Sequence, residues 1–457
     1  MLEEYSFKDK EEIRLALEKD DDFLVDFFAS ISHASDIIEI FRLVAVEKWP
    51  RLLSFINDKE QKASIISRLD PDEWYKLLPL LSPREIAEVI KELETDDAAD
   101  LLAEVPLANR MAALRMLSPK ERQQVQQLLK YPQDCAGGIM QLELALVDEG
   151  ATVLDTINIV RELVEEDVEV LSVLVVDKQN RLVGSLALVD LLLNKATKNV
   201  SEIMDKEVMF VKPLVDQEEV ALLFKKYDLI MLPVVDDNNR VLGRIVIDDI
   251  VDVLQEEAEE DALHMAGTSV EELLYQTSVF STARIRMPWL GIALCCSLLS
   301  ATLLHLFEAT MSKAVIILSF IPVITAMGGN VGTQSATVLI RGFATNKFDL
   351  SHVPKFLFKE IRVSMVIGLS YGFLTALVAT FLLTNYNFYL GFVVFCAMVC
   401  GMMTAAILGV IAPTLLKKFN IDPAIASGPF VTTLNDITGI LIYMLICTLF
   451  LAKLQVG

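Results

Sequence analysis

The sequence predicts a multidomain membrane protein that combines an N-terminal α-helical superhelix, a duplicated β-α-β-β-α module, a linker helix and five transmembrane α-helices. Two sequence repeats and an uneven charge distribution lead to this prediction. Residues 284–457 hold five of the 63 acidic residues and eleven of the 40 basic ones, so the net charge is −29 over residues 1–283 and +6 beyond them. One part of the chain is therefore acidic and polar, and the other is apolar.

Residues 1–134 are predicted to form an acidic domain of repeated short helices. Chain breaks recur about every dozen residues, at Asp70-Pro71, Ser82-Pro83, Thr95-Asp96, Val105-Pro106 and Ser118-Pro119. A capping side chain followed by proline is typical of a helix start, and regular repetition of such starts indicates a helical stack. The negative charge argues against nucleic acid as a partner and favours cations, although a solvated acidic surface is the alternative for any single residue.

A second repeat occupies residues 135–198 and 199–255. The segments VVDKQNRLVG and VVDDNNRVLG place Asp177 and Asp236 at equivalent positions, 59 residues apart. Short β-branched runs, Asn-Arg turns and amphipathic segments predict a β-α-β-β-α unit in each copy. The pair resembles tandem CBS domains, which implies a regulatory module. Many such pairs bind adenosine nucleotides, so ATP is a candidate ligand here, and a dimerisation module without a ligand is the alternative.

Residues 256–283 are predicted to form a strongly acidic linker helix that leads to a membrane domain at 284–457. Five apolar runs are each about the length that crosses a bilayer as a helix. They lie near 288–308, 314–340, 363–384, 388–414 and 424–452. Basic residues gather in alternate loops, and the amino terminus does not resemble a signal peptide. We therefore expect a multi-pass protein of the plasma (inner) membrane, with the acidic domains in the cytoplasm and the carboxyl terminus outside.

Polar residues interrupt two of these runs. Asp436 lies in PFVTTLNDITGILIYML beside Thr432 and Asn435, and charge at membrane depth usually faces a bundle interior or a water-filled path. The second run contains a polar, glycine-rich cluster with Gly328, Gly329, Asn330 and Gln334. We expect irregular backbone in this cluster, with freed carbonyls that face a cation. The candidate pore-lining residues are the four residues of the cluster together with Thr432 and Asn435. A small-residue packing face is the alternative for the glycines.

Oxygen ligands without nearby His or Cys suit a hard cation such as Mg²⁺, Ca²⁺ or Mn²⁺. One aspartate per chain is a sparse site, and five spans form a small bundle. Both considerations favour a two-fold homodimer embedded in membrane lipid, with divalent cations as partners and a path lined by both copies.

The whole arrangement resembles the MgtE family of magnesium channels. The resemblance rests on the order of the domains and on two specific segments, GGNVGTQSATVLIRG and DPAIASGPFVTTLNDITG. It implies a homodimeric Mg²⁺ channel that closes when regulatory Mg²⁺ neutralises cytosolic acids. It also implies a pore aspartate at Asp436 and a pore-entrance aspartate at Asp422. The regulatory acids that it implies are Asp96, Asp100, Glu218, Asp228, Asp249, Asp252, Glu257, Glu260 and Asp261.

Three other classes of function are weighed against this one. A secondary transporter coupled to Na⁺ or H⁺ could use the same Asp436. A nucleotide-sensing membrane scaffold would need no pore. An enzyme has the least support, because the sequence contains no nucleophile–base pairing, phosphate-binding loop or histidine cluster.

Overall fold

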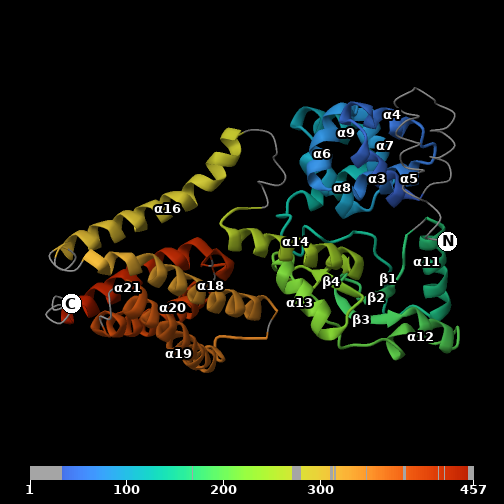
Figure 1. Cartoon of the computed structure of the whole chain (residues 1–457). Coiled ribbons are helices and arrows are strands. Elements are labelled where there is room, and N and C mark those ends of the chain that lie inside the picture. Colours follow the sequence, from blue (N-terminus) through green and yellow to red (C-terminus); the bar gives the residue numbers. More distant parts are fainter. Residues whose placement is uncertain are drawn as a thin grey trace. The chain divides into compact units, whose positions relative to one another are not determined.

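The computed structural model describes residues 33–166, 168–269, 279–308, 312, 315–345, 347–383, 388–419, 421–426 and 428–450. The chain divides into two compact units, Met1–Gln255 and Glu256–Gly457 (Figure 1). Each unit has its own hydrophobic core. The two units are therefore described one after the other.

The first part of unit one is a stack of short helices. They are α3 (Ala34–Leu43), the 3₁₀ turn η1 (Val46–Lys48), α4 (Trp49–Ser54), α5 (Lys59–Ser67), α6 (Pro71–Leu77), η2 (Leu78–Leu80), α7 (Pro83–Ile90), α8 (Thr95–Glu104), α9 (Leu107–Met116) and α10 (Pro119–Leu128). Helix α5 packs on α7 and α7 on α9, whereas α6 packs on α8 and α8 on α10. Each helix thus contacts the next but one, as in a solenoid. The predicted helical-repeat domain is confirmed.

The helix starts in this stack follow from local sequence. Helices begin at or directly after each of the five predicted breaks, at Pro71, Pro83, Thr95, Leu107 and Pro119. At α7 the Ser82 hydroxyl accepts a hydrogen bond from the Glu85 N–H at 3.3 Å, and the Glu85 carboxylate accepts one from the Ser82 N–H at 2.7 Å. Ser118 and Glu121 form the same reciprocal pair at α10. These capping boxes fix where each helix begins.

The second part of unit one is the duplicated module. Its first copy contains β1 (Leu146–Asp148), α11 (Val153–Glu165), β2 (Ser172–Val176), β3 (Leu182–Ala187) and α12 (Leu188–Leu193). The second copy contains η3 (Val200–Glu202), α13 (Gln217–Tyr227), β4 (Met231–Val235), β5 (Val241–Val246) and α14 (Ile247–Ala266). Strand β1 pairs in parallel with β2, and the β2–β3 and β4–β5 pairs are antiparallel. The first strand expected in the second copy is a single parallel bridge, Val211 to Val234.

The two Asn-Arg turns link the copies directly. Asn180 and Asn239 adopt left-handed backbone angles, with φ of 62° and 60°. Asparagine tolerates this conformation better than most residues do. The Leu182 N–H donates to the Asn239 carbonyl at 2.9 Å, and the Val241 N–H donates to the Asn180 carbonyl at 3.2 Å. The repeated turns therefore form a reciprocal backbone contact between the two copies.

The acidic linker helix is the second half of α14. This 20-residue helix starts in the second module and ends at Ala266, before Gly267 with φ of 78°. Residues 270–278 of the predicted linker lie outside the described residues. Helix α16 (Val279–Leu306) then begins ahead of the membrane domain boundary expected at 284.

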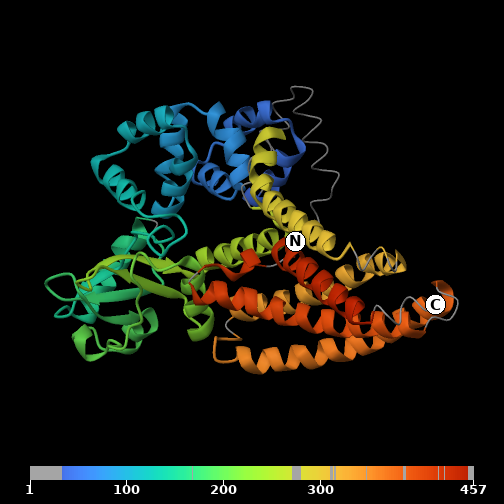
Figure 2. The same cartoon turned by 90° about the vertical axis from the view of Figure 1, so that its left-hand side faces the viewer.

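Within the described residues, unit two contains five helices that are long and apolar enough to cross a membrane, as predicted. These segments are Thr282–Leu306, Val315–Ala344, Val353–Phe381, Phe388–Lys418 and Phe430–Leu449. The first segment belongs to α16, and the second combines η4 (Val315–Phe320) with α18 (Ile321–Ala344). The third combines α19 (Val353–Val378) with the π-helical turn η5 (Ala379–Leu383). The fourth is α20 (Phe388–Lys418), and the fifth belongs to α21 (Gly428–Leu449), which follows the turn η6 (Pro423–Ala426). The orange and red helices run side by side in Figure 2, because α20 packs on α18, α19 and α21.

The third of these helices begins earlier than predicted, at Val353 instead of residue 363. Its first turns carry Lys355, Lys359 and Arg362. A prediction based on uncharged apolar runs therefore places the start of the helix after these residues. Long basic side chains at a helix end can extend to the membrane surface, so the helix continues through them.

The prediction of irregular backbone in the glycine-rich cluster is wrong. Helix α18 is continuous from Ile321 to Ala344, so its carbonyls are engaged in helical hydrogen bonds. The glycines instead permit close packing: a Cβ on Gly332 would lie 3.0 Å from Val431 Cγ1, and a Cβ on Gly409 would collide with the Gly332 carbonyl oxygen. Small residues let helix backbones approach closely in membranes. The packing alternative therefore accounts for the glycines of this segment.

The contact between Gly332 and Gly409 leads to a stability prediction. We expect Gly409→Ala to lower the melting temperature of the purified protein in detergent, because a methyl group there would force α18 and α20 apart, at a free-energy cost of about 1–3 kcal/mol. Gly291→Ala is the matched control, since a Cβ at Gly291 meets no atom within 4 Å. Equal melting temperatures for the two variants would contradict the close contact.

Candidate functional site

The acid at membrane depth, Asp436, lies in α21 one helical turn after Thr432 and is half-buried. Within the described part of the chain its carboxylate forms no hydrogen bond and no ion pair with another residue. A Cβ at Gly439, one turn further along, would meet no atom within 4 Å. Thr432 lies 3.4 Å from Thr333 of α18, measured between the two hydroxyl oxygens. Asp436 therefore lies half-buried, one helical turn from a polar contact between α18 and α21.

The other predicted pore-lining residues divide into two groups. Asn435 is almost fully buried and donates a hydrogen bond from Nδ2 to the Thr325 carbonyl at 3.3 Å. Its side chain fills the space that the absence of a Cβ leaves at Gly328, and Gly329 is buried in the same face of α18. Asn330 and Gln334, in contrast, are exposed one turn apart on α18. The structure thus places Asn435 and both glycines between helices, and the two α18 amides on an outer face of this single chain.

The predicted pore-entrance residue Asp422 contacts the acidic half of α14 within unit two. Its Oδ1 accepts a hydrogen bond from the Ala424 N–H at 2.8 Å, and its Oδ2 lies 3.2 Å from His264 Nδ1. Glu260 lies 3.7 Å from the other ring nitrogen of His264. The hydrogen bond to Asp422 raises the pKa of His264. Sequence reasoning missed His264, because only the fold brings it to Asp422.

A second charged contact and an apolar one join α14 to the membrane helices. Arg341 Nη1 of α18 lies 3.9 Å from Asp261 Oδ2. Burial raises the pKa of Asp261, and the nearby Asp422 carboxylate adds to this rise. Met265 packs on an apolar cluster that includes Ala336 and Val431. The end of α14 therefore lies on α18 and on the chain that leads into α21.

A separate acidic cluster lies in unit one, between the helical stack and the duplicated module. Glu94 occupies the N-cap position of α8, Asp96 lies in the first turn of this helix, and Asp249 lies in the first turn of α14. Gln141 joins two of them: its Nε2 donates to Glu94 Oε2 at 2.8 Å and to Asp249 Oδ2 at 3.2 Å. Asp96 is only 6% exposed, and its Oδ1 has no hydrogen-bond partner within the described residues.

Burial and mutual repulsion disfavour the charged form of these acids. Burial raises the pKa of Glu94 to about 7 and that of Asp249 to about 8, and neighbouring carboxylates add to both shifts. Burial, followed by repulsion from Asp249, also raises the pKa of Asp96 well above its usual value. Burial raises the pKa of Asp97 too, and Asp252 contributes to that rise. The cluster is therefore a site where a cation would relieve repulsion.

The remaining predicted regulatory acids lie elsewhere. Asp100 accepts a hydrogen bond from Gln133 Nε2 at 3.2 Å. Glu218 is in the first turn of α13, whereas Asp228 caps its other end with φ of 50°. Glu257 lies on α14 and is half-buried. The structure thus brings together Asp96, Asp249 and Asp252 around α8, and Glu260, Asp261 and Asp422 around His264.

The donor chemistry at both clusters suits a hard cation, since carboxylate oxygens predominate. The orphaned Oδ1 of buried Asp96 also fits such a ligand. No group of three or more His, Cys, Asp or Glu side chains among the described residues is arranged closely enough to hold a metal ion. A cation would therefore have to draw these carboxylates closer together.

Sequence reasoning also missed an intramembrane acid, Glu360 of α19. Its Oε2 accepts a hydrogen bond from the buried Ser335 hydroxyl of α18 at 2.8 Å. Unlike Asp436, this carboxylate therefore has a protein partner. Its place among Lys355, Lys359 and Arg362 in the sequence suggested only a charged helix end.

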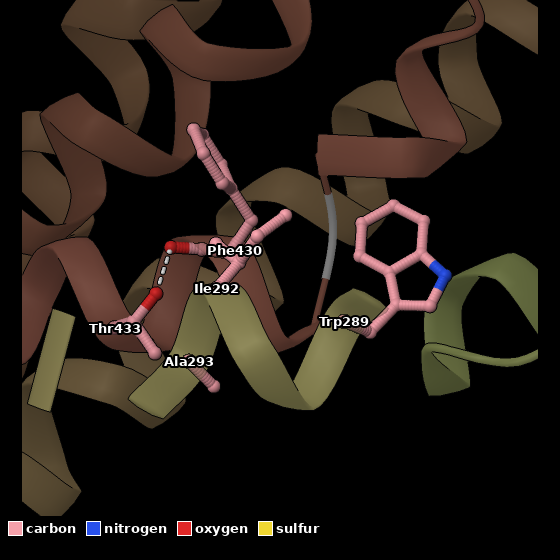
Figure 3. A pocket seen from close by; sticks show the side chains of 5 residues that line it. All are labelled: Trp289, Ile292, Ala293, Phe430 and Thr433. Atoms are coloured by element: carbon pink, nitrogen blue, oxygen red, sulfur yellow. Dashed lines mark hydrogen bonds between the residues drawn. The ribbon is translucent and has the colours of Figure 1, made fainter. Parts of the chain in front are cut away.

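One small crevice lies between α16 and α21 (Figure 3). Trp289, Ile292, Ala293, Phe430 and Thr433 line it, and Thr433 donates its hydroxyl to the Phe430 carbonyl at 3.0 Å. Its volume of about 10 Å³ is close to the minimum for one water molecule. This apolar crevice has no charged lining residue and does not include Asp436, so it is not a candidate ion path.

Comparisons with known proteins agree with this arrangement. A family model described as "Divalent cation transporter" matches residues 321–446, one described as "MgtE intracellular N domain" matches 32–134, and a CBS domain model matches 200–256. The magnesium transporter MgtE of Bacillus subtilis is 32% identical over 419 residues, which cover 92% of each chain. The MgtE of Thermus thermophilus is 34% identical over 425 residues, 92% of this chain and 93% of that one. This chain belongs to the MgtE family.

A solved structure extends the MgtE likeness to three dimensions. The cytosolic domain of an Mg²⁺ channel MgtE, in complex with ATP, superimposes with a TM-score of 0.51 at 32% identity, covering 53% of this chain and 99% of that one. The resemblance inferred from sequence is thereby confirmed. The chain is a multi-pass membrane protein of a magnesium transporter family, with an N-terminal helical domain, CBS domains and five membrane helices.

The raised pKa values in the acidic cluster lead to a prediction about pH. A carboxyl group whose pKa is raised in the folded state binds its proton more tightly there than in the unfolded chain. Between an unfolded pKa of about 4 and the folded values of about 7 for Glu94 and 8 for Asp249, rising pH should therefore lower the free energy of unfolding. We expect the full-length protein in EDTA to melt several degrees lower at pH 8 than at pH 6.

Asp249→Asn tests the origin of this effect, since it removes one titrating carboxyl and much of the repulsion on Asp96. The variant should melt higher than the wild type at pH 8 and show a weaker dependence on pH. An unchanged dependence would assign the pH effect to other groups.

Proposed function

We propose that this chain forms a Mg²⁺-selective channel for magnesium uptake, built as a homodimer with Asp436 of both copies beside the ion path. The supporting observation is the Asp436 carboxylate, which is half-buried at membrane depth and makes no hydrogen bond or ion pair with described residues. Such a charge is costly in a bilayer unless water or a cation reaches it. Mg²⁺ retains its waters strongly, so carboxylates that contact its hydration shell suffice for passage.

The dimer is supported by polar residues on the outside of the single chain. Asn330 and Gln334 are exposed on α18, where lipid would leave their amides without hydrogen bonds. A two-fold axis near this face would bring these amides and two Asp436 carboxylates toward a shared aqueous path. Two charges on one axis attract a divalent cation more strongly than one does.

Regulation is the second part of the proposal: cytosolic Mg²⁺ closes the channel by neutralising the acidic clusters. In unit two, Asp261 and His264 of α14 contact Arg341 and Asp422, so α14 is in a position to restrict the entrance near Asp422. A cation that relieves repulsion among Glu260, Asp261 and Asp422 would hold α14 in this place. Low Mg²⁺ would release it.

The remaining assignments follow from the same picture. We propose that the protein lies in the plasma (inner) membrane, with the N-terminal helical domain and the CBS domains on the cytosolic side and the carboxyl terminus outside. ATP is the proposed ligand of the CBS pair, supported by the likeness to an MgtE cytosolic domain in complex with ATP. We assign no enzymatic activity. We also assign no nucleic-acid partner, because the net charge of −29 over residues 1–283 would repel phosphates.

The pore assignment predicts that Asp436→Asn abolishes Mg²⁺ flux into liposomes, to less than about a tenth of the wild-type rate, because it removes the charge that attracts the cation. Glu308→Gln is the matched control, since Glu308 is an exposed acid beside His305. Circular dichroism and size-exclusion chromatography should show both variants folded. Wild-type flux through folded Asp436→Asn would reject the assignment.

The same liposomes separate a channel from the alternatives. Flux that continues without any Na⁺ or H⁺ gradient supports a channel, whereas dependence on such a gradient supports a secondary transporter. ATP binding without any cation flux would support a nucleotide-sensing scaffold.

The regulatory assignment predicts that Glu257→Gln, Glu260→Gln and Asp261→Asn together leave the channel open at high Mg²⁺. Without these charges a cation has little repulsion to relieve, so the Mg²⁺ concentration that halves the flux should rise by at least about tenfold. Glu162→Gln, Glu165→Gln and Glu166→Gln make a matched control, because these exposed acids lie at the end of α11. Inhibition identical to wild type in the α14 variant would contradict the proposed switch.

A further inference from the structure

Gln141 has a fixed backbone position beside the acidic cluster of unit one. Its N–H donates to the Arg244 carbonyl of β5 at 2.7 Å, and its carbonyl accepts from the Arg244 N–H at 2.9 Å. The residue is 1% exposed. Its side chain therefore extends from a rigid site and cannot move aside without leaving buried polar groups unpaired.

The side chain of Gln141 connects a buried cation with two acids. Arg244 Nη2 donates to Gln141 Oε1 at 3.3 Å. A guanidinium group can only donate hydrogen bonds, so it orients the amide oxygen toward itself and the NH₂ group away. The NH₂ group then donates to both Glu94 and Asp249, at 2.8 and 3.2 Å. One neutral amide thus bridges two carboxylates that would otherwise repel each other.

Arg244 is itself held in place behind this bridge. It is 2% exposed, and its Nη1 donates to the Glu169 carbonyl at 2.7 Å. Its Nε has no hydrogen-bond partner within the described part of the chain. The guanidinium group contacts Gln141 directly. Its positive charge also favours the ionised form of Glu94.

The two bridged carboxylates come from different parts of unit one. Glu94 belongs to the helical stack, and Asp249 belongs to the second module. Buried Asp96, with its orphaned Oδ1, follows Glu94 by two residues. A ligand that needs several of these oxygens gains affinity if the protein already holds two of them together, because less ordering remains to be done on binding.

We propose that Gln141, oriented by Arg244, is a positioning residue that holds Glu94 and Asp249 together before a divalent cation binds. It thereby sets the cation concentration at which the acidic cluster binds its cation and the channel closes. The inference rests on the proposed regulation by Mg²⁺. It assigns the sensitivity of the switch to a neutral amide that is not a metal ligand. The amide donates only to the carboxylates, so a cation would occupy their free oxygens while Gln141 remains in place.

The test uses full-length protein in detergent and in liposomes with Gln141→Met, which preserves side-chain length but removes both donors. We expect at least about tenfold more Mg²⁺ to be needed for half-maximal protection from trypsin and for half-maximal inhibition of flux, because the loss of even one hydrogen bond to a carboxylate corresponds to about that factor. Flux without cytosolic Mg²⁺ should equal that of the wild type. Saturating Mg²⁺ should restore full protection.

Gln141→Glu separates positioning from a general structural role. This variant keeps the length and can pair with Arg244, but it places a third carboxylate against Glu94 and Asp249. We expect faster trypsin cleavage without Mg²⁺ than in the wild type, and full protection once Mg²⁺ saturates. A purely structural role predicts instead that both Gln141 variants lose protection equally at every Mg²⁺ concentration, which would overturn the proposal.

Gln126→Met is the matched control, because Gln126 is an exposed amide side chain of α10 that lies outside the cluster. Its Mg²⁺ midpoint should equal that of the wild type, and an equal shift in both amide variants would contradict a specific role for Gln141. A wild-type midpoint in Gln141→Met would reject the positioning role alone. Flux in the wild type that Mg²⁺ does not inhibit would instead reject the proposed regulation, while trypsin protection would still report on Gln141.

Discussion

The repulsion between carboxylates that are removed from water constrains both units of this protein. A buried negative charge is strongly unfavourable unless a hydrogen-bond donor, a cation or water compensates it. In unit one the chain supplies partial compensation, through the amide of Gln141 and the charge of Arg244, but it leaves one oxygen of Asp96 without a partner. In unit two Asp436 has no compensating residue in the described part of its own chain. The two sites therefore share a chemical need for a cation from outside the chain.

Three different degrees of compensation suit three different tasks in a magnesium transporter. At Asp422 a histidine and a backbone N–H already contact the carboxylate, which favours a contact that forms and breaks with α14. At Glu94 and Asp249 a fixed neutral donor holds the acids near each other without cancelling their charge. At Asp436 the described residues supply no such group, which in the proposed channel would keep the carboxylate available to a passing ion. In the proposed mechanism, permeation and regulation thus both depend on carboxylates, and the surroundings of each carboxylate determine which of the two it serves.

Local signals made most of the fold predictable from sequence. Ser82 and Ser118 mark helix starts because their capping partners lie three residues away. The repeated Asn-Arg turns mark the links between strands because asparagine tolerates left-handed backbone angles. The glycine-rich cluster of α18 was misread, since low helix propensity gave way to packing: Gly332 and Gly409 allow two helices to touch. Asp436 stood out as an isolated acid, and Asp422 followed from the family resemblance. Gln141, Arg244 and His264 did not, because their partners are far away in sequence and only the tertiary structure brings them together.

The paired turns at Asn180 and Asn239 have a consequence for how the duplicated module can evolve. Each turn supplies a carbonyl to the strand that follows the other turn, so both backbone bonds depend on both turns. A substitution that moves one copy out of the left-handed region would weaken its twin as well. After the duplication the two copies could diverge in their outward-facing side chains. Substitutions at the paired turns, in contrast, would be restricted in both copies together. Sequence changes that specialise one copy are thus expected away from the backbone contact between the two turns.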